Sequence, residues 1–577
     1  MSSQEQPSSS CNPQDREDVV DAVDPVCPDD LAIARASDAS EIPSDVIEGI
    51  KAGSETKQKE LAGNLAGRSI LSQIYILAIW PFLELLGTSF VGLVDIAIAG
   101  RLGGEQTIRA LDSVGVAAYV TWLINMLFAA VGVGTGALVA RHIGAREKLK
   151  ANQVLGQAIL LGSIWGAFVG ILLYSSAPIF GVLFNLEGET LDLCTLYLRI
   201  LAIASPLCAV VMLGCASLRS AGDTRTPFLV VVVISIVNVI ASLALTFGPA
   251  PLGGYGVGGI AGGTAMAWLA GGLIILVTLV KGKGPDFISL ARWRNYAGGD
   301  LRALSARHPI SIRGGGPIDY AGVLPVRMRL MNLPLRLRKR WMKFDLPLSW
   351  RIVRIGIPSL IESSGMWLGN LAVAWMVGGL AVWHMEEVVD GVEGGVMGAH
   401  VVGIRIESLS FLPGMAIGIA SATLVGQYLG LGDVKRAKKA AMTSWAIGAG
   451  LMGLMGLSFI LMPNVYVSLL VGGKDAASVM MREKAVPLLV VVGFAQFFFG
   501  TYIVISQSLR GAGETVGPMI LTYASTFFIR LPAAYVIGVM LGYGLTGIWV
   551  ALSLELVVRG CVFFGWFQMG YWQKVKV

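Results

Sequence analysis

Long apolar runs follow one another from about residue 69 to the C-terminus, and they limit the possible folds more than any other feature of the sequence. Each run is close to the ~20 residues that a helix needs to cross the hydrocarbon core of a bilayer. Within that core, an α-helix satisfies its own backbone polar groups. We predict an all-α, polytopic membrane protein with about twelve transmembrane helices, at residues 70–98, 110–138, 153–180, 190–217, 227–248, 256–281, 350–380, 396–425, 438–463, 484–508, 517–541 and 546–570.

The composition agrees with a membrane protein. Hydrophobic residues make up 54% of the chain and charged residues only 14%, whereas soluble proteins are about one quarter charged. The 73 glycines fit helices that pack closely through small residues. The net charge of +6 does not indicate nucleic acid as a partner, because the basic residues are placed as membrane orientation requires.

Four regions follow from the pattern of charge and hydropathy. Residues 1–68 form an acidic tail that we expect to be disordered, without the basic and short apolar segments of a signal peptide. Residues 69–281 and 350–577 are the N-terminal and C-terminal six-helix lobes. Between them, residues 282–349 form a basic linker, which we expect to lie against anionic lipid headgroups.

The connections carry their charges asymmetrically. Basic residues gather in the second and eighth connections, at 141–150 and 435–439, and at the C-terminus, whereas the opposite connections are acidic. By the positive-inside rule, both termini are cytoplasmic. We expect a monomer in a plasma membrane, specifically a bacterial inner membrane.

The two lobes repeat each other. Residues 217–224, with Pro227, match residues 508–515, with Pro518, at an offset of 508 − 217 = 291. Similar offsets relate three further pairs: Gly144 and Gly430, Gly254 and Gly542, and Pro81 and Pro358. An even number of helices per lobe makes the repeat parallel, with its pseudo-two-fold axis along the membrane normal. Lobes related in this way are typical of transporters that expose a central site to each side in turn.

Asp95 and Asn238 are polar residues within apolar runs. A carboxylate there costs about 2.5–3.5 kcal/mol, so Asp95 is a candidate for exchanging one proton against one cationic substrate. The alternative is a carboxylate near the outer helix end that Arg101 neutralises. Asn238 can donate and accept hydrogen bonds, either at an ion site or simply between two helices.

Glu84 and Glu362 each follow a helix-kinking proline, Pro81 or Pro358, by about one turn. Proline frees a carbonyl of the preceding turn and lets a helix bend, so these carboxylates are candidates for substrate binding or gating. Alternatively, they form ion pairs with nearby arginines, namely Arg351, Arg354 or Arg405.

Arg405 and Glu407 are opposite charges within one predicted span, on different faces of the helix. Such charges are rare in membranes, and we expect either ion pairs or substrate contacts. The four histidines and six cysteines follow no metal-ligand or disulfide spacing, so we predict neither a metal site nor a cofactor.

Several motifs together resemble the multidrug and toxic compound extrusion (MATE) family, nearest its DNA-damage-inducible branch. They are Val94-Asp95 with Ala99-Gly100 and Leu102-Gly103, residues 136–139 with Gly144, residues 218–223, residues 424–427 with Gly430, and residues 509–515. The resemblance covers roughly 70–570. It implies two six-helix lobes that export small organic, often cationic compounds in exchange for protons or sodium, and no enzymatic activity.

The resemblance also places the family's coupling aspartate at Asp95. In the family, the asparagine that matches Asn238 is followed one turn later by a second acidic residue, but here that residue is Ser242. Two ions therefore stay open: a proton carried by Asp95 among neutral partners, or sodium bound by Asp95, Asn238 and hydroxyl oxygens.

Two other functions have weaker support in the sequence. A flippase for a lipid-linked precursor would line its cleft with several basic residues, but few arginines lie in the predicted spans, chiefly Arg199, Arg405 and Arg530. A membrane sensor or enzyme would need residues 282–349 as its working domain. That segment has no phosphate-binding loop, metal cluster or nucleophile motif.

Overall fold

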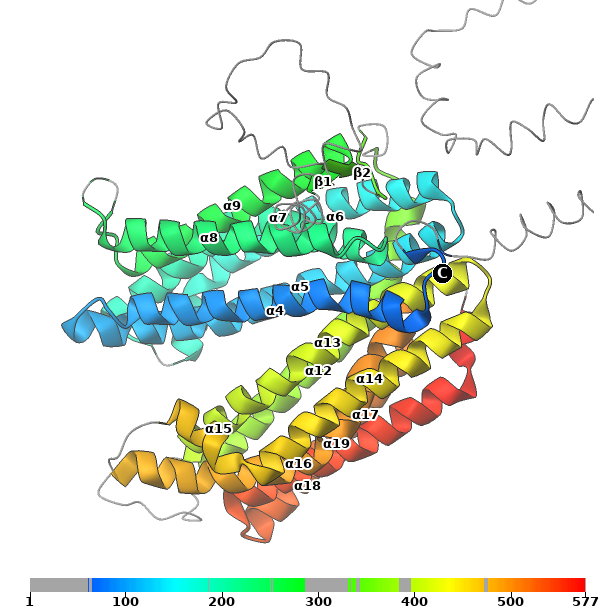
Figure 1. The fold of residues 1–577 in the computed structure, drawn as a ribbon. Helices are drawn as coiled ribbons and strands as arrows, with labels where there is room; N and C mark the ends of the chain where they lie inside the picture. The colour runs from blue at the N-terminus through cyan, green and yellow to red at the C-terminus, as the bar shows by residue number, and fades with distance from the viewer. Residues whose placement is uncertain are drawn as a thin grey trace, which may run out of the picture. The chain divides into compact units, whose positions relative to one another are not determined.

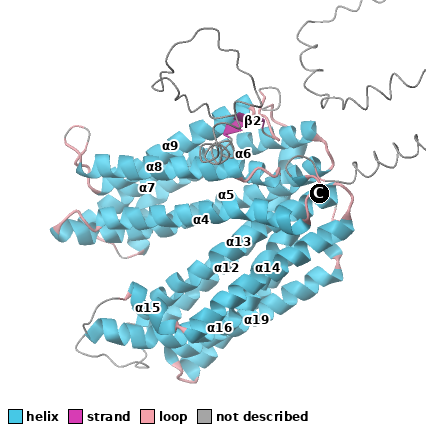
Figure 2. Cartoon of the chain, in the orientation of Figure 1, coloured by secondary structure: helices cyan, strands magenta, loops and turns pink. Residues whose placement is uncertain are grey.

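The computed structural model describes residues 61, 65–184, 186–249, 251, 253–285, 330–332, 334–338, 343–382, 396–471 and 476–575. These residues are almost entirely helical (Figures 1 and 2). Eleven helices in the described part of the chain are long and apolar enough to cross a membrane. The polytopic α-helical fold is therefore confirmed.

The N-terminal lobe contains six long helices, each close to its predicted span. They are α4 (Ile70–Ala99), α5 (Gly104–Gly144), α6 (Lys148–Leu183), α7 (Gly188–Ser220), α8 (Arg225–Phe247) and α9 (Val257–Lys281). Helix α5 extends beyond its predicted span at both ends, and at the C-terminal end the polar residues Arg141 and His142 continue the helix past the apolar run.

The C-terminal lobe repeats this order. Its helices are α12 (Leu346–Val382), α13 (Val396–Gly430), α14 (Val434–Leu461), the short α15 (Pro463–Leu470), α16 (Ala476–Gly511), α17 (Val516–Ser525) and α19 (Gly544–Met569), followed by the 3₁₀ helix η6 (Tyr571–Lys574). Between α17 and α19 the chain continues through two π-helical segments, η4 (Thr526–Arg530) and η5 (Ala534–Met540), separated by α18 (Leu531–Ala533). Pro532 in α18 lacks a backbone N–H, so regular α-helical bonding cannot continue there.

The repeated motif forms the same turn in both lobes. Gly222 and Gly513 adopt φ values of 94° and 86°, which favour glycine. The amide after each glycine donates to the carbonyl oxygen five positions earlier, over 2.9 Å in both lobes. The side chains of Asp223 and Glu514 then accept backbone amides at the start of the next helix, at 3.1 and 2.7 Å. The motif is thus a helix stop joined to a helix start.

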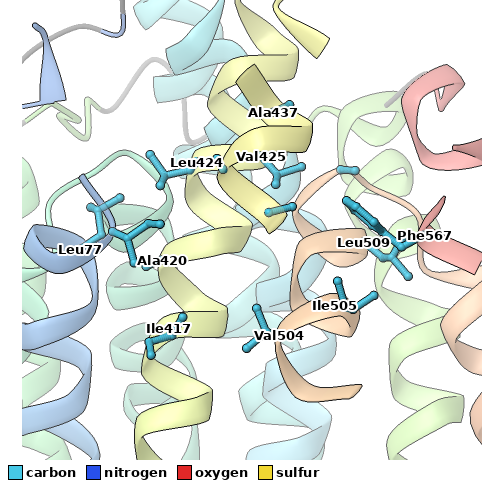
Figure 3. Packing of buried hydrophobic residues seen from close by; sticks show 14 of the residues in the cluster. Leu77, Ile417, Ala420, Leu424, Val425, Ala437, Val504, Ile505, Leu509 and Phe567 are labelled. Carbon is cyan, nitrogen blue, oxygen red and sulfur yellow. The ribbon is translucent and has the colours of Figure 1, made fainter. Parts of the chain in front are cut away.

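The first helix of each lobe packs against both lobes. Helix α4 contacts α8 of its own lobe and α13 of the other, and α12 contacts α17 of its own lobe and α5 of the other. A buried apolar cluster fills the α4–α13 contact, where Leu77 lies beside Ala420 and Leu424 (Figure 3). The two lobes are therefore connected through their proline-containing first helices, α4 and α12.

The described ends of the linker lie against the N-terminal lobe. Strands β1 (Lys283–Pro285) and β2 (Leu330–Asn332) pair antiparallel, and Leu335 and Leu337 are buried among helices of that lobe. The amide of Arg336 donates to Asn152 Oδ1 over 2.7 Å. Residues 1–60 and 286–329, with most of the linker's basic residues, lie outside the described part, so the predicted tail and headgroup contacts stay predictions.

Candidate functional site

Asp95 lies in the last two turns of α4 and meets Asn238 of α8. The two side chains are hydrogen-bonded, and Asn238 Nδ2 also donates to Thr264 Oγ1 of α9 over 3.0 Å. Tyr197 of α7 is buried close to Asp95 and hydrogen-bonds Thr264. Four helices thus bring one carboxylate, one amide and two hydroxyl groups together, which we call the Asp95 cluster.

Two oxygen atoms in the Asp95 cluster are unsatisfied. Asp95 Oδ1 and Asn238 Oδ1 are both buried, and neither has a hydrogen-bond partner within the described chain. Buried acceptors without partners cost about 1–3 kcal/mol each. Arg101, which was the alternative partner of Asp95, is exposed, and no ion pair joins these two described residues. The cluster therefore has the chemistry of a site that takes up a proton or a small cation.

Ser242, one turn after Asn238, faces a different environment. Its hydroxyl donates to the Ile260 carbonyl oxygen of α9 over 3.4 Å, and it is fully buried. A Cβ placed on Gly263 would overlap Ser242, so α8 and α9 touch at this point. The structure therefore brings Asn238 to Asp95 but places Ser242 in a helix–helix contact.

Glu84 and Glu362 occupy equivalent places in the two lobes. Arg219 Nη1 donates to Glu84 Oε1 over 2.6 Å, and Arg510 Nη2 lies 2.9 Å from Glu362 Oε2. Each pair joins the first helix of a lobe, one turn after Pro81 or Pro358, to the end of the fourth helix. The partners are thus the arginines of the repeated turns rather than Arg351, Arg354 or Arg405.

Arg405 and Glu407 do not form a pair. Arg405 is exposed, and none of the described acidic side chains lies within ion-pair distance of it. Glu407 lies near Arg530, with which it interacts electrostatically. Arg530 in turn belongs to a buried network with Glu555 and Arg559 of α19. The sequence indicated Arg530 as an arginine within a predicted span, but it did not indicate Glu555 and Arg559 as its partners.

The two lobes also touch along the basic end, where α5 and α13 end and basic loops follow them. A Cβ on Gly144 would overlap the Gln427 carbonyl oxygen, and one on Gly430 would overlap that of Arg141. Thr423 Oγ1 donates to the Arg219 carbonyl oxygen over 3.2 Å. The repeated glycines therefore form one reciprocal contact that closes the molecule at this end.

These features define the class of protein: a membrane transporter built from two related six-helix lobes, with the polar Asp95 cluster inside the N-terminal one. The family model MatE matches residues 81–243 and 358–536, more than half of the chain. The chain belongs to the MatE family of transporters.

Named relatives agree with this assignment. The probable multidrug resistance protein NorM of Thermotoga maritima is 25% identical over 490 residues, which cover 84% of this chain and 89% of that protein. The probable multidrug resistance protein YoeA of Bacillus subtilis is 20% identical and covered over 99% of its length, with 91% of this chain. A crystal structure of MATE in the bent conformation shares the fold with a TM-score of 0.70 at 19% identity, covering 87% of this chain and 95% of that one.

Proposed function

We propose that this protein exports small organic cations across a bacterial inner membrane in exchange for protons, by alternating access. The family supports transport, and the names of the relatives support multidrug resistance as its outcome. The basic end, by the positive-inside rule, faces the cytoplasm. The reciprocal glycine contact then holds the protein closed towards the cytoplasm, and ions reach the Asp95 cluster from the opposite side.

The observation that carries the proposal is the pair of unsatisfied oxygens on Asp95 and Asn238. A proton on Asp95 Oδ1 turns one of the two acceptors into a donor and removes the negative charge from an apolar lobe. When a cationic solute enters the central space, it favours the ionised carboxylate and the proton leaves. Competition between one proton and one cation for the same negative charge is sufficient for antiport.

Sodium is the second candidate for the coupling ion, and the same oxygens favour it. Asp95 Oδ1, Asn238 Oδ1 and the hydroxyl of Thr264 are oxygen ligands of the kind that hard cations prefer. Binding of sodium would leave the charge of Asp95 in place, whereas binding of a proton removes it. The two candidates therefore differ in which gradient drives transport.

Glu84 and Glu362 are assigned to gating in this proposal. Each ties a helix, just after its proline, to the repeated turn at the basic end. Bending of α4 or α12 at Pro81 or Pro358 would move these pairs together with the glycine contact. Their ion pairs therefore stabilise the closed basic end, and neither carboxylate is placed to exchange ions with the Asp95 cluster.

The test is ethidium efflux measured in everted vesicles, in which export carries ethidium from the medium into the lumen, driven separately by an imposed proton gradient and an imposed sodium gradient. We expect proton-driven efflux in the wild type, a loss of at least about a hundredfold for Asp95→Asn, as general acid–base steps contribute on that scale, and no change for Asp112→Asn. Asp112 is the matched control, because it is an exposed aspartate on α5. Efflux driven only by a sodium gradient would identify sodium, rather than the proton, as the coupling ion. Retention of full activity by Asp95→Asn would refute the role of this residue.

A further inference from the structure

Arg199 lies well inside the membrane-spanning part of α7. It follows Gly188, the first residue of that helix, by eleven positions, which is about 16 Å at 1.5 Å per residue. Helix α7 has 33 residues and is therefore about 50 Å long, whereas the hydrocarbon core is about 30 Å thick. When α7 is centred on the core, Arg199 lies inside the half of the core that is farther from the basic end.

The surroundings of Arg199 face lipid. Leu196 and Ile203, three residues before it and four residues after it, are 47% and 73% exposed. On α6, Ile171 and Tyr174 are also exposed. Other sides of α7 pack against α5, α6 and α9. The side chain of Arg199, which is partly exposed, therefore lies at the edge of the α6–α7 contact, where the lobe meets the acyl chains.

The guanidinium of Arg199 lacks a negative partner within the described chain. Its Cζ lies 5.1 Å from the centroid of the Tyr174 ring, but Nε is buried without a hydrogen-bond partner. Of the acidic residues at the start of α7, Glu189 pairs with Arg109, and Asp192 is exposed and forms no ion pair with Arg199. Arginine stays charged, and a charge within the core costs about 2.5–3.5 kcal/mol or more.

A phosphate group has the chemistry that Arg199 lacks. The guanidinium presents its N–H donors in a fork that matches phosphate oxygens, and Tyr174 stabilises the cation without satisfying those donors. Long basic side chains in a membrane extend towards the headgroups. The Cα–Cβ bond of a helical residue tilts towards the N-terminus of its helix, and in α7 that direction leads to the nearer membrane surface.

We propose that Arg199 binds the phosphate group of a phospholipid whose acyl chains run past Ile203. The phospholipid belongs to the leaflet farther from the basic end, which is the outer leaflet by the positive-inside rule. The site is separate from the headgroup contacts predicted for residues 282–349, because these lie at the other leaflet. It is also independent of the proposed function, since it concerns the bilayer and not the transported solute.

The test is photocrosslinking from p-benzoylphenylalanine in place of Ile203. The full chain is reconstituted in vesicles of phosphatidylglycerol and uncharged monogalactosyldiacylglycerol, in equal amounts and with the same acyl chains, and mass spectrometry gives the ratio of the two adducts. With Arg199 present, phosphatidylglycerol should be enriched at least about tenfold over its share of the bilayer, the scale of one charge-assisted hydrogen bond. Arg199→Met should abolish the enrichment. Arg199→Lys keeps the charge without the fork and should retain only part of the enrichment.

The contribution of the tyrosine ring has its own matched control. Tyr174→Leu removes the ring beside the guanidinium and should lower the enrichment by about twofold to fivefold, the scale of one cation–π contact. Tyr119→Leu removes a similarly exposed tyrosine of α5 that stacks on Phe184 rather than on an arginine. This control should leave the adduct ratio unchanged.

Four outcomes would overturn the proposal. The first is an adduct ratio equal to that of the bilayer when Arg199 is present, and the second is undiminished enrichment in Arg199→Met. The third is loss of the enrichment when glycerol 3-phosphate is added, which would assign the site to a soluble phosphate. The fourth concerns folding: Arg199→Met removes an uncompensated charge, so in lipid-free maltoside micelles it should unfold at no lower temperature than the wild type. A lower unfolding temperature would make Arg199 structural.

Discussion

The Glu84–Arg219 and Glu362–Arg510 pairs occupy equivalent joints of the two lobes but have different surroundings. The side chain of Glu84 is 14% exposed, and that of Glu362 is 0% exposed. Glu362 Oε1 also accepts hydrogen bonds from Thr522 over 3.1 Å and from Tyr502 over 3.5 Å. The joint of the C-terminal lobe is therefore part of a buried polar network, whereas that of the N-terminal lobe is a nearly isolated pair.

This difference suggests that the two repeated lobes have different roles in transport. The turn, the proline and the ion pair are present twice, because both lobes need the same connection between their first and fourth helices. The polar centres differ, and the proposed function explains this, because a coupling site needs a carboxylate that can gain and lose its charge. We infer that α12 is held more rigidly than α4, and that the N-terminal lobe supplies most of the movement.

The largest expected effect comes from removing the two carboxylates in turn. Glu362→Ala removes a fully buried carboxylate that bonds Arg510, Thr522 and Tyr502, and should destabilise the protein by about 3–5 kcal/mol. Glu84→Ala removes a partly exposed carboxylate whose side-chain partner in the described chain is Arg219 alone, and should cost less, about 1.5–3 kcal/mol. Thermal unfolding of the detergent-solubilised protein measures both. Equal shifts in the unfolding temperature would contradict the proposed difference in rigidity between α12 and α4.

The reciprocal glycine contact involves both lobes equally, so we expect substitution of either glycine to have the same effect. Gly144→Ala and Gly430→Ala each place a methyl group against a carbonyl oxygen of the other lobe. Overpacking typically costs about 1–3 kcal/mol, so both variants should reduce the population closed at the basic end by roughly tenfold or more. Distances between spin labels on the ends of α5 and α13, in a cysteine-free background, report this population.

The control for the glycine contact is Gly115→Ala on α5, where a Cβ has open space. It should leave the distance distribution unchanged. If only one of the two glycine variants opened the basic end, the contact would not be reciprocal in solution, and the two lobes would differ at this joint as well.

The sequence predicted the helices well because hydropathy is a property of whole segments. The predicted span 256–281 became Val257–Lys281, and 70–98 became Ile70–Ala99. The repeat also predicted which turns would match. The partners of Glu84 and Glu362 were not predictable, since Arg219 is 135 residues from Glu84 and several arginines were equally plausible on sequence grounds.

The missed site residues differ in the signal they offered. Glu555 and Arg559 are four residues apart in an apolar run, a spacing that places opposite charges on one helix face, and this pattern could have indicated the buried network that they form with Arg530. Tyr197 and Thr264 gave no comparable signal, because single hydroxyl groups are common in membrane helices. Their contact with Asp95 depends on how four helices pack, which no local pattern encodes.

The smallest expected effects separate two neighbours on α8. Asn238→Ala removes the amide that bonds both Asp95 and Thr264, and should reduce proton-driven ethidium efflux by about tenfold, as expected for one lost hydrogen bond to a charged group. Ser242→Ala removes only a long bond to a backbone carbonyl, and should change efflux by less than about twofold. Both variants are compared at equal amounts of protein in the same everted vesicles. If Ser242→Ala lowered efflux as much as Asn238→Ala, its hydroxyl would have to reach the ion during transport. The helix α8 would then have to rotate relative to α9, and the close contact at Gly263 would have to open in each cycle.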